Sequence, residues 1–212
     1  MEPSATKKTL EAKKSAEMLS ESVFAFPMSF AQQRLWFLDQ FEPGNPIYNI
    51  AWAIRLQGQL DIQALERSLN EIIRRHEVLR ATFTSINDQP VQVIAPALII
   101  QLDITDLSAL RGPERDIQLR KEIQQQAERP MDLQKGPLFG ARLLRLGAED
   151  HVALLSIHHI IFDRWSRGIF FRELTALYSA FTKGEPNPLH ELPLQFTDYA
   201  VWQRQFLQGK NL

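Results

Sequence analysis

The clearest pattern along the chain is a strict alternation of apolar and polar side chains over residues 48–56. Because successive side chains of a strand point to opposite faces, this period of two predicts a half-buried strand. The apolar positions on its inner face are Tyr48, Ile50, Trp52, Ile54 and Leu56. Turn residues at 87–90 and 147–150 separate further strand-like runs in two predicted hairpins. These further strands are expected at 81–86, 91–95, 139–146 and 151–159.

Apolar residues three and four positions apart predict five helices. Ser29 is a suitable cap for the first helix, and Asp61 begins the second. The aromatic side chains of the first and last helices are interpreted as core residues, and the last helix is expected to direct Tyr199, Trp202 and Phe206 inward. The helices are expected over 30–41, from 61 through 73, over 113–128, over 165–183 and from 197 onward.

This order of strands and helices predicts an α/β fold of layered α+β type, in which a mixed β-sheet of at least four strands is flanked by helices. Residues 23–212 are expected to form the folded part. Residues 1–22 mix charges with scattered apolar positions, and we interpret them as a leader or linker that is disordered or forms a short helix over 9–19. An element that docks on a partner chain is the alternative for this segment.

Composition and charge exclude several classes of function. The 212 residues include 24 Lys and Arg against 25 Asp and Glu, and this near-neutral balance argues against nucleic-acid binding. The chain has no cysteine, so disulfides, thiolate metal sites and a cysteine nucleophile are excluded. No apolar run approaches the roughly 20 residues that span a bilayer, and the first residues do not resemble a signal peptide. We therefore expect no membrane contact and a cytoplasmic location.

Two adjacent histidines, His158 and His159, end an apolar strand. Alternation along the strand directs their side chains to opposite faces, which argues against both of them binding one metal ion. We therefore expect no metal site. One histidine is expected to face a substrate while its neighbour faces the core.

Asp163 follows at the predicted turn from strand to helix, and two interpretations of it stay open. It is either the cap of the helix that begins near Trp165 or a buried carboxylate that pairs with an arginine. The chain contains no GxSxG, GxxxxGK[ST], HExxH or GxGxxG motif. The histidine pair and this aspartate are therefore the strongest candidates for chemistry.

Five segments in this order resemble the condensation domains of nonribosomal peptide synthetases and, more loosely, acyltransferases of the chloramphenicol acetyltransferase type. The resemblance runs from about Phe26 to Gln208, and the HHxxxDG signature of the family corresponds to residues 158–163. The segments are SFAQQRLW at 29–36, RHEVLRATF at 75–83, MDLQKGPL at 131–138, HHIIFD at 158–163 and FTDYAVW at 196–202.

The resemblance implies that this chain is the N-terminal lobe of a two-lobed domain with its active site between the lobes. It implies that an amine and an acyl thioester, each held on the phosphopantetheine of a carrier protein, react directly to form an amide. By the same resemblance His159 is the catalytic histidine, either as a general base or by positioning the amine. His158 is then a supporting residue, and Asp163 a structural one that pairs with Arg75 or Arg80.

The resemblance also implies the partners of the chain. These are the C-terminal lobe, the donor and acceptor peptidyl carrier proteins and a neighbouring adenylation domain, and the lobe itself is expected to bind no cofactor. The motifs of the second lobe are missing, and residues 208–212 correspond to the start of a linker towards it. The isolated lobe is therefore expected to fold but to catalyse poorly.

One residue departs from the family pattern, because Arg164 stands where the family has a glycine after the aspartate. Arg164, Trp165 and Ser166 are candidates for the acceptor route, and an Arg164 side chain turned to solvent is the alternative. Two other functions stay open for the whole chain. One is an ester-forming or epimerising relative, and the other is a non-catalytic module that docks carrier proteins or enzymes.

Overall fold

The structure is a computed structural model that describes residues 24–207. The predicted leader at 1–22 and the predicted linker start at 208–212 lie outside these residues. Seven strands form two sheets, and five α-helices and two 3-10 helices surround them. The α/β layered fold predicted from the sequence is confirmed, with two sheets where one was expected.

The larger sheet has the strand order β2-β7-β6-β5 and determines where the histidine pair lies. Its strands are antiparallel except for β5 and β6, which are parallel. The smaller sheet has the order β1-β4-β3 and is antiparallel throughout. The strands are β1 Phe24–Pro27, β2 Asn49–Gln57, β3 Ala81–Ile86, β4 Gln89–Ile94, β5 Asp103–Asp106, β6 Phe139–Gly147 and β7 Asp150–His158.

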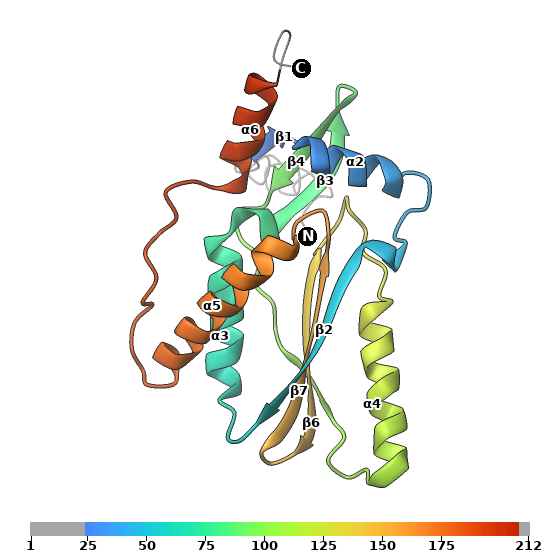
Figure 1. Ribbon diagram of the computed structural model, residues 1–212, viewed down its shortest axis with the longest axis vertical. Coiled ribbons are helices and arrows are strands. Elements are labelled where there is room, and N and C mark those ends of the chain that lie inside the picture. Colours follow the sequence, from blue (N-terminus) through green and yellow to red (C-terminus); the bar gives the residue numbers. More distant parts are fainter. Residues whose placement is uncertain (1–23, 208–212) are drawn as a thin grey trace, which may run out of the picture.

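Helices cover both faces of the larger sheet (Figure 1). On one face α3 and α5 bury the main core, to which β7 contributes Leu155 and Ile157. On the other face α4 packs against a smaller cluster that includes Leu144 and Leu154. The helices are α2 Phe30–Asp39, α3 Ile62–Arg75, α4 Gly112–Ala127, α5 Arg164–Phe181 and α6 Phe196–Phe206, with η1 at Pro46–Tyr48 and η2 at Glu77–Arg80.

Local sequence signals account for most of these boundaries. Ser29 accepts a hydrogen bond from the Gln32 N–H while the Gln32 side chain accepts one from the Ser29 N–H, so a capping box begins α2. Asn87 and Asp88 both have positive φ angles of 50° and 60°, as a tight hairpin turn between β3 and β4 requires. Both features were predicted from the sequence.

The prediction that Tyr199, Trp202 and Phe206 point inward is wrong. These side chains are 44%, 54% and 52% exposed, because α6 packs through its small residues Thr197 and Ala200 instead. The same holds for α2, where Phe37 and Phe41 are exposed and only Gln32 is buried. Helical spacing places residues on one face, but it does not say which face meets the protein.

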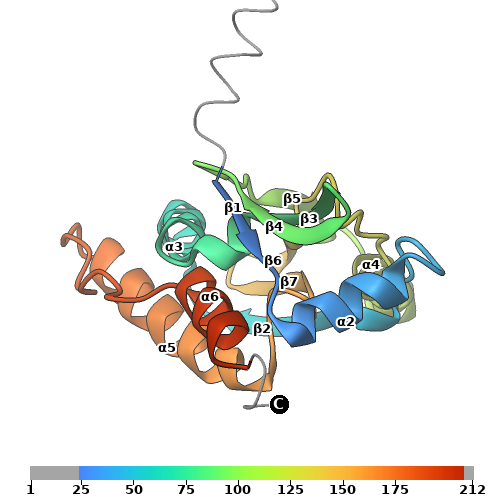
Figure 2. The same ribbon diagram turned by 90° about the horizontal axis from the view of Figure 1, so that it is seen from above.

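The small sheet, α2 and α6 lie at the end of the larger sheet where β7 finishes and α5 begins (Figures 1 and 2). The loop 159–163 joins these two elements. This end of the molecule therefore brings together three of the five sequence motifs, from segments far apart in the chain.

Candidate active site

His158 is the last residue of β7 and is a buried structural residue. Its side chain is only 2% exposed, and its Nδ1 accepts a hydrogen bond of 3.1 Å from the backbone N–H of Ile160. Burial, helped by the neighbouring charge of His159, lowers the pKa of His158 to about 4. The ring is therefore neutral at pH 7 and carries its proton on Nε2.

His159 points the opposite way and is exposed. Its backbone N–H donates to the carbonyl oxygen of Tyr48 at 2.8 Å, which holds the residue at the end of the β2–β7 pair. Its side chain borders two hollows at once. The opposite orientations predicted for the two histidines are therefore present in the structure.

The two hollows beside His159 differ in chemistry. The first runs along α5 and is bordered by Arg164, Trp165, Gly168 and Arg172. The second has a volume of about 280 Å³ and lies between α2, the loop 159–163 and α6. Its apolar lining includes Ala31, Leu35, Ile160 and Phe196. An imidazole between them can exchange a proton with a group that enters from either side.

Asp163 caps α5. Its Oδ1 accepts hydrogen bonds from the backbone N–H of Ser166 at 2.8 Å and from the Ser166 hydroxyl at 2.7 Å. Burial alone would raise the pKa of Asp163, but these hydrogen bonds outweigh it and hold the pKa below its usual value. The carboxylate is therefore ionised, and of its two interpretations the structure has the helix cap. Ser166 is committed to this cap.

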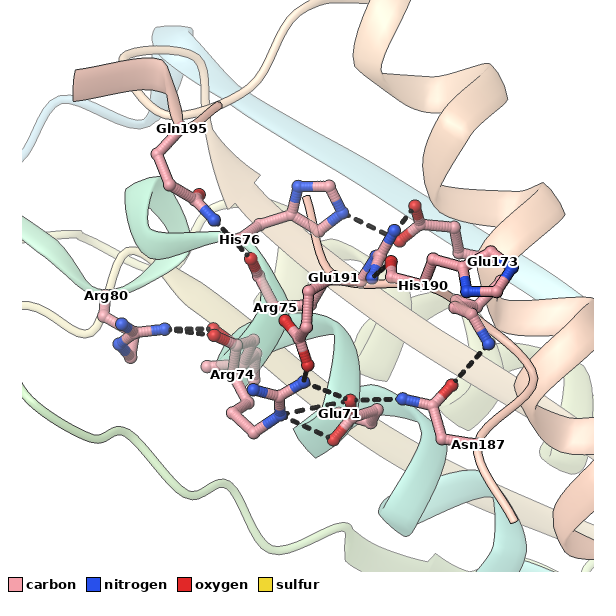
Figure 3. A network of polar contacts seen from close by, with 12 residues as sticks. Glu71, Arg74, Arg75, His76, Arg80, Glu173, Asn187, His190, Glu191 and Gln195 are labelled. Carbon is pink, nitrogen blue, oxygen red and sulfur yellow. Dashed lines mark hydrogen bonds and ion pairs between the residues drawn. The ribbon is translucent and has the colours of Figure 1, made fainter. Parts of the chain in front are cut away.

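The predicted pairing of Asp163 with Arg75 or Arg80 is not present among the described residues. The side chain of Arg75 is buried, its Nε lies 3.2 Å from Glu173 Oε1, and its Nη1 donates to the carbonyl oxygen of His190 (Figure 3). His76 Nε2 contacts the other oxygen of Glu173 at 2.7 Å. The arginine fastens α3 to α5, because its carboxylate partner belongs to α5.

Arg80 binds backbone carbonyl groups. Its guanidinium donates to the oxygens of Ile73, Arg74 and Ala95 at 2.6–3.0 Å, so it closes the C-terminal end of α3. Gln195, just before α6, donates to the Arg75 carbonyl and accepts from the Glu77 N–H. Sequence reasoning missed Glu173 and Gln195, since an isolated Glu or Gln gives no signal of a partner about a hundred residues away.

Arg164 and Trp165 lie on the surface of the first turn of α5. The Trp165 side chain is 84% exposed, and the Arg164 side chain is also exposed. Both border the hollow that begins at His159. The side chain of Arg164 is thus turned to solvent and beside the site at the same time.

Two negative findings apply to residues 24–207. Within this range no group of three or more His, Asp and Glu side chains is arranged to hold a metal ion. Of the helices described, none has the length and apolar character that crossing a membrane requires.

The sequence model of one family, described as "Condensation domain", matches residues 25–212. A linear gramicidin synthase from Brevibacillus parabrevis is 50% identical over 188 residues, which cover 89% of this chain and 2% of that protein. Chondramide synthase cmdD of Chondromyces crocatus is 46% identical over 179 residues, or 84% of this chain and 5% of that protein.

Solved structures agree with this assignment. The starter condensation domain of rhizomide synthetase RzmA has a TM-score of 0.78 at 23% identity, over 88% of this chain and 44% of that one. The X-domain from teicoplanin biosynthesis has a TM-score of 0.76 at 30% identity, over 85% and 38%. The chain thus spans a small share of the curated relatives and less than half of each solved domain. It belongs to the condensation-domain family of nonribosomal peptide synthetases and forms the part of that domain that carries the paired histidines.

Proposed function

We propose that this chain supplies the histidine-bearing wall of a site that forms an amide bond between two carrier-bound substrates. The observation that carries the proposal is the exposure of His159 between two separate hollows, while His158 is buried and neutral. Two openings that meet at one imidazole suit two reactants arriving from different sides. Family membership supports the same reaction.

In the proposed reaction the amine nitrogen attacks the thioester carbonyl carbon. The new C–N bond forms, the C–S bond breaks, and the proton that the amine loses is balanced by the proton that the departing thiolate gains. His159 accepts the amine proton or holds the amine in line and stabilises the tetrahedral intermediate. General-base catalysis of this kind contributes about 10²–10⁴ in rate, and alignment of the tethered reactants contributes more.

The partners in this proposal are the donor and acceptor carrier proteins, with phosphopantetheine as their cofactor and not one of this lobe. An adjoining adenylation domain, a second lobe that closes the two hollows and a cytoplasmic location belong to the same proposal. Since the chain matches 44% of the solved starter condensation domain, the remainder of such a domain is available to form the opposite wall. On this basis the lobe alone is a poor catalyst, and the complete domain is active.

The test is His159→Ala in the synthetase module that contains this chain, with both carriers loaded. We expect product formation to fall about 10²–10⁴-fold, with unchanged carrier affinity and unchanged thermal unfolding. Arg120→Gln is the matched control, because Arg120 is an exposed residue of α4 on the other face of the sheet. Full product formation by His159→Ala would refute the proposal.

One observation favours a second candidate. A chain with 31% identity and a TM-score of 0.76 is the X-domain solved in a complex with OxyB from teicoplanin biosynthesis. A docking role for this chain predicts that His159→Ala leaves product formation unchanged, whereas surface substitutions abolish capture of a partner enzyme. The same experiment therefore separates the two candidates.

A further inference from the structure

The hollow along α5 has a regular construction. Arg164, Gly168 and Arg172 border it at four-residue intervals, so they lie on one face of the helix. A Cβ atom built on Gly168 would meet no atom within 4 Å, so the helix backbone is open to the hollow at this position. The result is a groove with a bare floor and one guanidinium group at each end, which begins at His159.

Both guanidinium groups are available to a ligand. Arg164 and Arg172 are exposed, and neither forms an ion pair or hydrogen bond within residues 24–207. Asp163 is the single acid among the residues that border the groove, and Ser166 already occupies its Oδ1. Glu173, the next acid along α5, is buried against Arg75 on another side of the helix. The groove is therefore net positive.

Charge and dimensions together restrict what fits. The eight residues from Arg164 to Arg172 separate their backbones by about 12 Å along the helix axis. Trp165 and Ile169 add apolar surface between the charges. The groove therefore suits an extended ligand that has its reactive end at His159, a weakly polar middle and an anion at the far end.

We propose that this groove binds the phosphopantetheine arm of one of the two carriers, with its phosphodiester at Arg172. The arm matches in order: a thioester at one end, two amide units in the middle and a phosphodiester at the other end. Guanidinium groups bind phosphate oxygens through paired, charge-assisted hydrogen bonds. Arg164, nearer to His159, donates to the carbonyl oxygens of the arm. This inference rests on the proposed function, which supplies the arm as ligand.

The test compares the affinity of the module for each carrier in its holo form, which bears the arm, and its apo form, which lacks it. We expect Arg172→Gln to weaken binding of one holo carrier about tenfold, the loss typical of one charge-assisted contact at an exposed site. Binding of both apo carriers stays unchanged, and Arg120→Gln changes none of the four affinities. Gly168→Leu fills the floor of the groove without changing charge, and it should weaken the same holo carrier while thermal stability is retained.

Three results would overturn the inference. Equal weakening of the holo and apo forms means that Arg172 contacts the carrier protein and not its arm. A changed preference between acidic and neutral amino acids, with holo affinity unchanged, means that the groove binds a substrate carboxylate. No change in any affinity means that the groove binds neither.

The affinity comparison does not depend on catalysis, so it is distinguishable from the test of the proposed function. If Arg172→Gln weakens one holo carrier while His159→Ala still forms product, the arm site stands and the proposed role of His159 fails. If His159→Ala abolishes product while Arg172→Gln changes no affinity, the reverse holds.

Discussion

Two charged motifs of this chain look alike in sequence but differ in their surroundings. The residues 75–80 form a closed network, in which Arg75, His76 and Arg80 all bind groups of the protein itself. The residues 158–166 form an open loop, in which only His158 and Asp163 are engaged and His159 faces two hollows. The closed network joins α3 to α5 and so holds the start of the helix on which the open loop depends.

This difference separates residues that build the site from residues that act in it. A side chain whose hydrogen-bonding groups are all satisfied by the protein has nothing left for a substrate, whereas an exposed imidazole at a strand end does. Substitutions in the closed network should therefore cost stability, and substitutions at His159 should cost activity. The predictions below test this contrast through stability, where the two motifs are expected to differ most.

The largest effect is expected for Glu173→Ala. The variant leaves the buried guanidinium of Arg75 without its counter-charge and removes the partner of His76, since both contact this one carboxylate. Loss of one partner of a buried ion pair costs about 3–5 kcal/mol of the free energy of unfolding. Urea denaturation at pH 7 measures it.

The control for this variant is Glu191→Ala. Glu191 pairs with Arg74 on the surface, where its side chain is 70% exposed, so its removal should cost at most about 1 kcal/mol. Equal losses for the two variants would contradict the view that the network is a buried structural element.

The next effect concerns pH. The pKa of His158 is about 4 in the folded protein, against an ordinary value of 6.5, because the ring is buried. Between these two pH values the unfolded state binds a proton that the folded state does not, so this contribution to stability is present above pH 6.5 and is lost as pH falls towards 4. The loss amounts to about 3 kcal/mol over that window.

Urea unfolding of the wild type and of His158→Gln at several pH values isolates this contribution, because the difference between them removes the other titrating groups. The difference should shrink as pH falls from 6.5 towards 4. A pH-independent difference would contradict it, and NMR titration of the His158 ring measures the same pKa directly should the variant unfold.

The regular elements of the fold were largely predictable because their signals are local. The period of two in β2, the caps at Ser29 and Asp61 and the turn at Asn87 and Asp88 all depend on neighbours in the sequence. The four-residue strands β1 and β5 were missed, since each is too short to show a period and is defined by its pairing with a distant strand.

The candidate site was predictable only in part, for a related reason. Strand alternation predicted that His158 and His159 face opposite ways, and the structure has that arrangement. The partners of Asp163 and Arg75 were not predictable, because ion pairs depend on side chains that folding brings together. Resemblance to a family suggested the wrong partner for both residues, while capping, a local interaction, identified the right one for Asp163.

The smallest effect is expected at Asp163, and it sharpens the contrast between a cap and a buried ion pair. Asp163→Ala removes the acceptor of the Ser166 N–H and should cost about 1 kcal/mol of the free energy of unfolding. Asp163→Asn should cost only a few tenths, because asparagine is an equally good N-cap. A buried pair with arginine predicts instead a loss of about 3–5 kcal/mol for both variants, since neither side chain carries the charge. Urea denaturation of the two variants at pH 7 therefore distinguishes a residue that shapes the loop through its own helix from one that ties the loop to the closed network.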